Sequence, residues 1–228
     1  VHFNSDYKDK AFHIKLNKGA KDLSLFYQVN DRETISYDST FRLSGTSHIK
    51  AWAIKKGKPY GVPFEIELYQ HKGLDATING LNEYYEGYSG GGDLCIADGL
   101  RGSENFRDGR WQGYSGTDFQ AILSFDKVQQ IDSVVSSFYQ YNLSWIFMPV
   151  KIIVYTSIDG KNYYNRAVFE PQISDRAEGQ FFEEFVITFP EVDAKYVKIK
   201  ATNIGECPEW HPAAGSDAWL FIDEVRVY

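Results

Sequence analysis

Apolar and polar residues alternate with a period of two along most of the chain, and this pattern predicts β-strands. In a strand such alternation places one face on a core and the other in water. The runs lie at residues 12–16, 23–29, 48–54, 64–68, 121–125, 150–155, 196–201 and 225–228. Turn-forming residues separate several of them, at 17–19, 56–59 and 159–162. No capped helical run of ten or more residues appears, so we expect an all-β protein made of antiparallel β-sandwiches.

Charge and aromatic content divide the chain near residue 72. The 228 residues carry 24 Lys and Arg against 31 Asp and Glu, a net charge of −7. Residues 1–72 hold 12 basic and 8 acidic side chains, whereas residues 73–228 hold 12 basic and 23 acidic ones and four of the five Trp. We therefore predict a small domain over 1–72, the size of a seven-strand sandwich, and a larger domain over 73–228.

Composition excludes several classes of protein. An aromatic content of 16% is too high for a disordered chain. An acidic chain is a poor partner for duplex nucleic acid, and no run of 18 apolar residues is present to span a membrane. The chain starts at Val1 without a leader, so we interpret it as a mature chain or a fragment whose location no signal reveals.

The two cysteines leave two interpretations open. Cys95 and Cys207 lie 112 residues apart, which is not a metal-binding spacing. In a secreted protein they could form a disulfide. Otherwise they are two separate buried thiols.

The first domain has a recognisable stretch around the 48–54 strand. Residues 25–31, 37–38 and 41–59 together resemble the small immunoglobulin-like domain at the C-terminal side of chitobiases and β-hexosaminidases. The resemblance covers about residues 10–70; it departs at the turn 28–31 and at Phe41, where Pro is common. It implies a module without chemistry of its own. We expect Trp52 in the core, and His13 and His48 on a solvated face.

Five ordered motifs characterise the second domain. They lie at residues 94–103, 111–125, 154–163, 194–199 and 222–228. Together they resemble the discoidin domain, also called coagulation factor 5/8 type C, which in glycan-active bacteria is the family 32 carbohydrate-binding module. The resemblance implies a galactose-binding-like jelly-roll β-sandwich. An insert between Ser103 and Trp111 departs from the family pattern, as does Ser124-Phe125-Asp126 where Asp-Leu-Gly is typical.

The discoidin resemblance also implies a structural Ca²⁺ at one end of the sandwich. Ca²⁺ takes six to eight hard oxygen ligands. Asp98 and Glu224 would supply charge, Ser103 a hydroxyl and Leu100 a backbone carbonyl. The alternative is that Asp98 belongs to an ordinary Asp-Gly turn and Glu224 is a solvated strand residue.

Sugar binding needs an aromatic face for the pyranose ring beside polar groups for its hydroxyls. Loop residues at one end of the sandwich should provide both. Our candidates are Trp145 in the segment 140–149, Trp210 and His211 between two prolines, and Arg110 and Tyr114 in a third polar-aromatic loop that also holds Arg107 and Asp108. The alternative is that these Trp are plugs that close the barrel end, and we expect Trp111 and Trp219 to be core.

The domain order and the absence of catalytic motifs indicate a non-catalytic accessory protein. No Gly-x-Ser-x-Gly, His-Glu-x-x-His or phosphate-binding loop is present. Hexosaminidases carry their carboxylates on a (β/α)₈ barrel of about 250 residues, which this chain lacks. An immunoglobulin-like domain followed by a discoidin-like domain resembles the C-terminal portion of family 20 β-N-acetylhexosaminidases.

This resemblance implies a secreted or periplasmic protein that docks on a glycan beside an upstream catalytic domain of the same polypeptide. The acidic balance of residues 73–228 argues against anionic lipid and fits a neutral glycan. Two rival functions stay open: a spacer that packs on its own catalytic barrel, and an adhesion module for protein or cell surfaces.

Overall fold

A computed structural model describes all residues from 1 to 228 and divides them into two compact units, Val1–Gln70 and His71–Tyr228. The division falls two residues before the predicted boundary because the buried ring of His71 lies against Glu224 in the second unit, with Nε2 2.8 Å from Oε1. No helix in the structure has the length and apolar character needed to cross a bilayer. The prediction of an all-β protein is confirmed.

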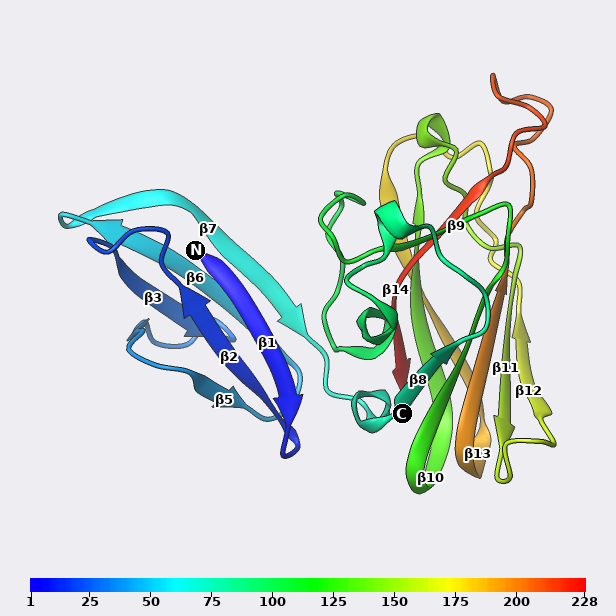
Figure 1. The fold of residues 1–228 in the computed structure, drawn as a ribbon. Coiled ribbons are helices and arrows are strands. Elements are labelled where there is room, and N and C mark those ends of the chain that lie inside the picture. Colours follow the sequence, from blue (N-terminus) through cyan, green and yellow to red (C-terminus); the bar gives the residue numbers. More distant parts are fainter. The chain divides into compact units, whose positions relative to one another are not determined.

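The first unit is a β-sandwich of seven strands in two sheets (Figure 1). One sheet has the order β1(His2–Lys8), β2(Ala11–Asn17), β5(Phe41–Leu43). The other has the order β4(Ile35–Ser36), β3(Ser24–Val29), β6(Ser47–Lys55), β7(Lys58–Leu68). The inward residues are the apolar positions of the alternating runs, including Phe12, Ile14, Leu25, Ile49 and Leu68.

We expected Trp52 in the core, but the structure places it outside the core. On β6 the buried positions are Ile49, Ala51 and Ala53, so Trp52 shares the outer face with His48. There it stacks on Phe26 of β3, with ring centroids 6.3 Å apart. The strand period of two decides this placement, because residues of the same parity share a face.

The second unit is built on one long antiparallel sheet. Its order is β12(Tyr164–Phe169), β11(Lys151–Ser157), β13(Phe181–Thr202), β10(Phe119–Gln140), β14(Trp219–Val227), β9(Gln112–Ser115), and β8(Thr77–Gly80) pairs with β10. Before β8 the chain of this unit forms the 3₁₀ turn η1(Lys72–Asp75). The strands β10 and β13 have 22 residues each.

These two long strands turn the sheet into a sandwich. The pairing of β10 with β13 shifts register between Ser124 and Gln129. Before the shift β10 pairs with the second half of β13 and with β8; after it, β10 pairs with the first half of β13 and with β14. A bulge of this kind bends a strand and increases its twist. Side chains from both halves then share one core, including Leu123, Phe138, Phe185, Ile199 and Leu220.

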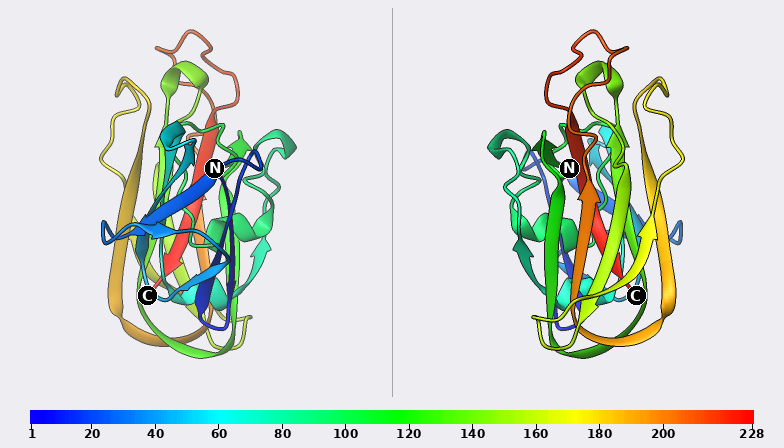
Figure 2. Two further views of the ribbon diagram at one scale, coloured as in Figure 1. Left: turned by 90° about the vertical axis from the view of Figure 1, so that its left-hand side faces the viewer. Right: turned by 90° about the vertical axis from the view of Figure 1, so that its right-hand side faces the viewer.

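Irregular segments cover the outer face of β14 and of the second half of β10. Residues 81–111, with the 3₁₀ turns η2(Glu86–Tyr88) and η3(Asp93–Ala97), run alongside β14 in Figure 1. As a result β14 is buried on both faces from Leu220 onward. The loops 141–149 and 203–218 lie together at one end of the sandwich in both views of Figure 2.

Candidate functional site

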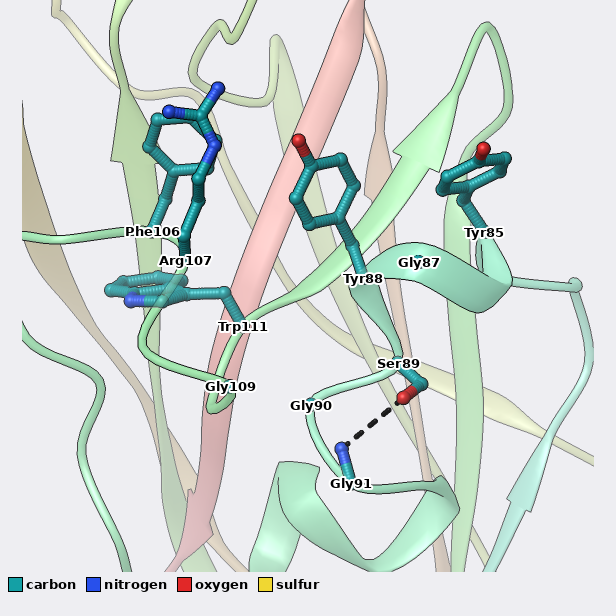
Figure 3. Close-up of a pocket in the computed structure, with 10 residues that line it drawn as sticks. All are labelled: Tyr85, Gly87, Tyr88, Ser89, Gly90, Gly91, Phe106, Arg107, Gly109 and Trp111. Carbon is teal, nitrogen blue, oxygen red and sulfur yellow. Dashed lines mark hydrogen bonds between the residues drawn. The ribbon is translucent and has the colours of Figure 1, made fainter.

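Two adjoining pockets lie among the loops of the second unit, and we call them together the aromatic groove. Their volumes are about 360 and 300 Å³, at the small end of the range for ligand sites. Both are lined by Tyr88, Phe106 and Arg107. The first also has Tyr85 and Trp111 in its lining, and the second Leu143, Ser144, Trp145, Ile146, Trp219 and Phe221. Figure 3 shows the first pocket.

The walls of the groove are a connected set of aromatic rings. Tyr88 meets Trp219 edge-on with centroids 5.5 Å apart and Phe221 at 4.9 Å. Phe106 is buried and meets Phe221 at 5.5 Å and Tyr139 at 5.8 Å. Edge-to-face pairs of this kind add to the stability that area burial provides. The groove therefore has a rigid apolar floor beneath its exposed rings.

The turn η2 positions the two tyrosines. The Tyr85 N–H donates to the carbonyl of Gly113 on β9, and the Tyr88 N–H donates to the carbonyl of Tyr85, both at 2.8 Å. Gly113 is required for this packing, because a Cβ there would lie 2.9 Å from Phe221 and 3.0 Å from Tyr88. In Figure 3 the polar ends of Tyr85 and Tyr88 point the same way as that of Arg107.

The insert between Ser103 and Trp111 supplies Phe106 and Arg107 on a loop closed by side-chain turns. The Asn105 N–H donates to Ser103 Oγ at 3.2 Å, and the Arg107 N–H donates to Asn105 Oδ1 at 3.1 Å. Asp108 accepts from the Ser103 and Arg110 amides. Such turns fix a loop without regular structure. The insert between Ser103 and Trp111 therefore builds part of the groove.

Trp145 enters the groove from a left-handed turn. It ends the 3₁₀ turn η4(Asn142–Ser144) with φ 64°, and its N–H donates to the carbonyl of Asn142 at 2.8 Å. The carbonyl of Trp145 accepts from the Trp219 N–H at 2.8 Å, which connects the turn to β14. The Trp145 side chain is 42% exposed. This ring is therefore presented to solvent and is not a plug.

Two other predicted sugar-binding residues lie outside the groove lining. Tyr114 is a core residue on β9, 1% exposed, and its hydroxyl donates to Gln112 Oε1 at 2.9 Å, so its prediction as a ligand contact is wrong. Tyr114 is buried because it faces the core position Phe119 at 5.5 Å. Arg110 is half-buried and donates to the carbonyl of Arg101 at 3.2 Å, beside the groove.

The prediction for His211 is also wrong. Its ring is 6% exposed, with Nε2 2.8 Å from the carbonyl of Asn142 and Nδ1 3.1 Å from the Ala213 N–H. Trp210 is half-buried: its Nε1–H donates to Asp175 at 2.8 Å, and Arg176 stacks over it at 5.0 Å. Neither residue lines the groove. The bonds hold two loops together, so this pair fits the alternative of a plug.

Sequence reasoning missed most of the groove. It named Arg107 only as a member of the third loop, assigned Trp219 to the core and left Tyr85, Tyr88 and Phe106 unassigned. Trp219 is half-buried with one ring edge toward Tyr85, at 5.5 Å. The available signal was the concentration of tyrosines in the turn-rich segment 84–93. A segment without regular structure rarely carries three aromatic residues unless they pack against something.

A second site, apart from the aromatic groove, brings together the two acidic residues predicted to hold Ca²⁺. Asp98 follows η3 and meets Glu224 of β14, close enough for the two carboxyls to share a hydrogen bond. Burial raises the pKa of both groups, and for Glu224 the charge of Asp98 adds to the rise. Glu224 Oε2 is buried and meets no donor. Two buried carboxylates in contact need a proton or a cation between them.

The other members of the predicted metal set are less well placed. The Ser103 hydroxyl accepts from Asn105 in an exposed turn, and the Leu100 N–H donates to Asp98 Oδ1 at 2.8 Å. No group of three or more His, Cys, Asp or Glu side chains is arranged around a common metal position. The residues therefore fit a cation in part. Asp98 and Glu224 offer two carboxylates, and Glu224 Oε2 is free to bind a cation. Backbone oxygens or water would have to complete its coordination.

Neighbouring groups fix the protonation state of His71 in the same site. Its Nδ1 accepts from the Val227 N–H, so Nε2 carries the proton and donates to Glu224 Oε1. Burial, with the nearby charge of Arg226, lowers the pKa of His71 to about 3. The ring is therefore neutral and acts as a hydrogen-bond donor. Gly99 donates a second bond to the same oxygen at 3.1 Å.

Cys95 and Cys207 are separate buried thiols, so the disulfide alternative does not hold. Burial raises the pKa of both thiols. A thiol of this kind behaves as a small apolar side chain.

The chain was compared with protein-family models and with curated proteins, and neither comparison gives a match. Solved structures do resemble it. A pectin-binding carbohydrate-binding module is 19% identical, with 66% of this chain and 88% of that chain covered and a TM-score of 0.40. A family 32 carbohydrate-binding module from Clostridium perfringens, in complex with GalNAc-β-1,3-galactose, is 13% identical (68% and 96% covered, TM-score 0.42).

Another similar structure is a chitosan-binding module of a chitosanase/glucanase from Paenibacillus sp. IK-5, 14% identical (70% and 99% covered, TM-score 0.42). Any ligand of this chain has to be inferred from its own residues.

Proposed function

We propose that the second unit is a glycan-binding module whose ligand lies in the aromatic groove. The observation that carries the proposal is the combination of exposed aromatic rings, above all Tyr85 and Trp145, with the exposed Arg107 between two adjoining pockets. Aromatic faces pack on the apolar side of pyranose rings, and hydroxyl and guanidinium groups bond their hydroxyls. Two pockets side by side suit two consecutive sugars of a chain.

The groove lining favours recognition over catalysis. No carboxyl, imidazole or thiol group lines either pocket, whereas glycoside hydrolysis needs positioned carboxyls. We infer a weak single-site affinity, on the order of 10 μM to 1 mM, because few atoms become buried in an open groove. Such a module raises the local substrate concentration for an attached enzyme.

The parent enzyme is a further part of the proposal. We infer an accessory portion of an extracytoplasmic glycoside hydrolase, with a β-N-acetylhexosaminidase as the first candidate. Support comes from the resemblance of residues 10–70 and from the domain order. The upstream coding sequence is the test: an upstream (β/α)₈ pattern with an Asp-Glu pair supports the hexosaminidase, and any other catalytic fold replaces it.

Glycan-array binding with matched variants tests the central proposal. Tyr85→Ala and Trp145→Ala each remove an exposed ring from the groove and should reduce binding at least tenfold, because each ring loses its stacking contact. Tyr164→Ala is the control, since Tyr164 is 61% exposed on the edge strand β12 and lines neither pocket. Trp210→Ala tests the site first predicted from sequence and should leave binding unchanged.

The outcomes separate the rival functions. Loss of binding only in the two groove variants supports the proposal. Failure of the wild-type chain to bind any glycan overturns it and favours a spacer. Retained glycan binding in both groove variants would show that the glycan site lies outside the groove.

We also propose that Asp98 and Glu224 hold a structural Ca²⁺. The support is the pair of buried carboxyls in contact and the buried Glu224 Oε2 without a donor. The melting temperature should fall after chelation and recover with Ca²⁺, because a ligand that binds only the folded state stabilises it. Glu224→Gln should abolish this dependence, whereas Glu209→Gln in an exposed loop should not. A melting temperature unaffected by chelation would assign the site to a shared proton.

A further inference from the structure

Arg107 stands out among the arginines around the aromatic groove because its guanidinium has no partner. Its backbone N–H bonds Asn105, but the side chain only stacks on Phe106, with the guanidinium carbon 4.5 Å from the ring centroid. By contrast Arg101 and Arg226 both contact Glu184, and Arg110 donates to a backbone carbonyl. Arg107 is exposed and lines both pockets.

The stack holds the guanidinium in position. Phe106 is 5% exposed and is fixed by Tyr139 and Phe221 beneath it. A planar guanidinium on such a ring keeps its N–H groups free at the edge. Figure 3 shows Arg107 over Phe106, with its nitrogens directed away from Trp111. The donors are therefore pre-oriented before any ligand arrives.

The charge of the groove is opposite to that of its surroundings. Residues 73–228 carry a net charge of −11, yet no carboxylate lines either pocket. The nearest acidic neighbour in sequence, Asp108, uses its carboxylate to accept from the Ser103 and Arg110 amides. A single uncompensated cation in an apolar-walled pocket favours an anionic ligand, because a planar fork of donors matches a carboxylate or a sulfate.

We propose that the glycan recognised by the groove is acidic, with a sugar carboxylate or sulfate ester bound by Arg107. The inference rests on the proposed function and names its ligand class. It also replaces the neutral glycan that the overall acidity favours. Net charge is an average over the surface, whereas a ligand within a Debye length of Arg107 meets the local lining first.

Titration calorimetry on the full chain tests whether the groove prefers an acidic glycan. It uses three probes: oligogalacturonate, its fully methyl-esterified form, and a sulfated galactan oligomer. The ester is the neutral counterpart of the same sugar chain. The wild-type chain should bind oligogalacturonate at least tenfold more tightly than the ester, because the ester cannot form the charge-assisted hydrogen bond between a sugar carboxylate and Arg107. Added salt should weaken acid binding and leave ester binding unchanged. The sulfated arm distinguishes a sulfate site from a carboxylate site.

Arg107→Gln should remove the preference for the acidic probe, because acid binding falls at least tenfold and ester binding falls much less. Arg176→Gln is the matched control, because Arg176 also stacks on an aromatic ring, that of Trp210, but lines neither pocket. Equal affinity of the wild-type chain for acid and ester without tighter binding of the sulfated galactan, or a preference for an acidic probe that survives in Arg107→Gln, would overturn the inference. Binding of neutral glycans alone would leave the proposed function standing, whereas binding of no glycan would overturn both.

Discussion

Single residues explain why the groove exists where it does. Gly102 lies against Trp111 and Gly113 lies against Tyr88 and Phe221, so two residues without side chains allow the aromatic cluster to close. The backbone of Gly102 is also hydrogen-bonded, because its N–H donates to Asp223 Oδ2 at 2.8 Å. Burial raises the pKa of Asp223 to about 6. The local geometry is therefore decided by the smallest residues and the bonds they make.

Gly102→Ala should destabilise the second unit. A Cβ at this position would lie 2.3 Å from Trp111 Nε1, and the fully buried ring has no room to move. Overpacking of this kind costs about 1–3 kcal/mol. Chemical denaturation should show this loss, whereas Gly80→Ala, with no atom closer than 3.9 Å, serves as the control. Equal stability of both variants would mean that the Trp111 packing is looser than described.

Asp159 should contribute stability that depends on pH. Its carboxylate accepts from the Asn162 and Lys161 amides at 2.8 Å, and these bonds lower its pKa below the ordinary value of 3.8. A depressed pKa means that the contribution is present above 3.8 and is lost as pH falls toward the folded-state value. The melting temperature of Asp159→Asn should therefore lie below that of wild type at pH 6, and the gap should narrow below pH 4. A constant gap would contradict this assignment.

At the scale of elements, irregular segments and not strands carry the site. The turns η2 and η4 and the loop 103–110 each present two or three groove residues, while β14 supplies the wall beneath them. Covering the outer face of β14 explains why that strand is buried on both faces, where alternation alone predicts a solvated face. The loops therefore bury the outer face of β14 as well as presenting the groove residues.

Trp145→Gly should separate stability from binding. Trp145 adopts φ 64°, a conformation that costs a non-glycine residue roughly 1–2 kcal/mol. Glycine removes this strain but loses more entropy on folding, by roughly 0.5–1 kcal/mol. The free energy of unfolding should stay within about 1 kcal/mol of wild type, while glycan affinity falls as in Trp145→Ala. A large loss of stability would show that the ring also supports the fold.

For the whole molecule, the two units have independent cores, and both candidate sites lie in the second unit. Every residue of the groove and of the Asp98–Glu224 pair lies within His71–Tyr228. The first unit contributes none of them. His71, whose ring is hydrogen-bonded to Glu224 and to the Val227 amide, marks the start of the second unit.

The fragment 71–228 should fold by itself and bind the same glycans as the full chain. It contains its own core and all groove residues, and the division of the chain falls directly before His71. Its glycan affinity should match that of the full chain within a factor of about two, because no groove contact is removed. A fragment that starts at 73 lacks His71 and should melt at a lower temperature. Loss of binding in a folded 71–228 fragment would implicate the first unit.

The sequence by itself determined the fold class and most strand positions, whereas the meeting of Asp98 with Glu224 was expected only from the resemblance of the motifs to discoidin domains. Alternation is a local property of neighbouring residues, so eight runs of it could be located without tertiary contacts. The tertiary structure alone decided the groove. Tyr85, Phe106, Trp145 and Trp219 come from four separate segments, and their sequence spacing carries no information about which loops meet. The same reason explains the errors at Tyr114 and His211: aromatic residues near turns look alike in sequence, and only packing decides which are buried and which face solvent.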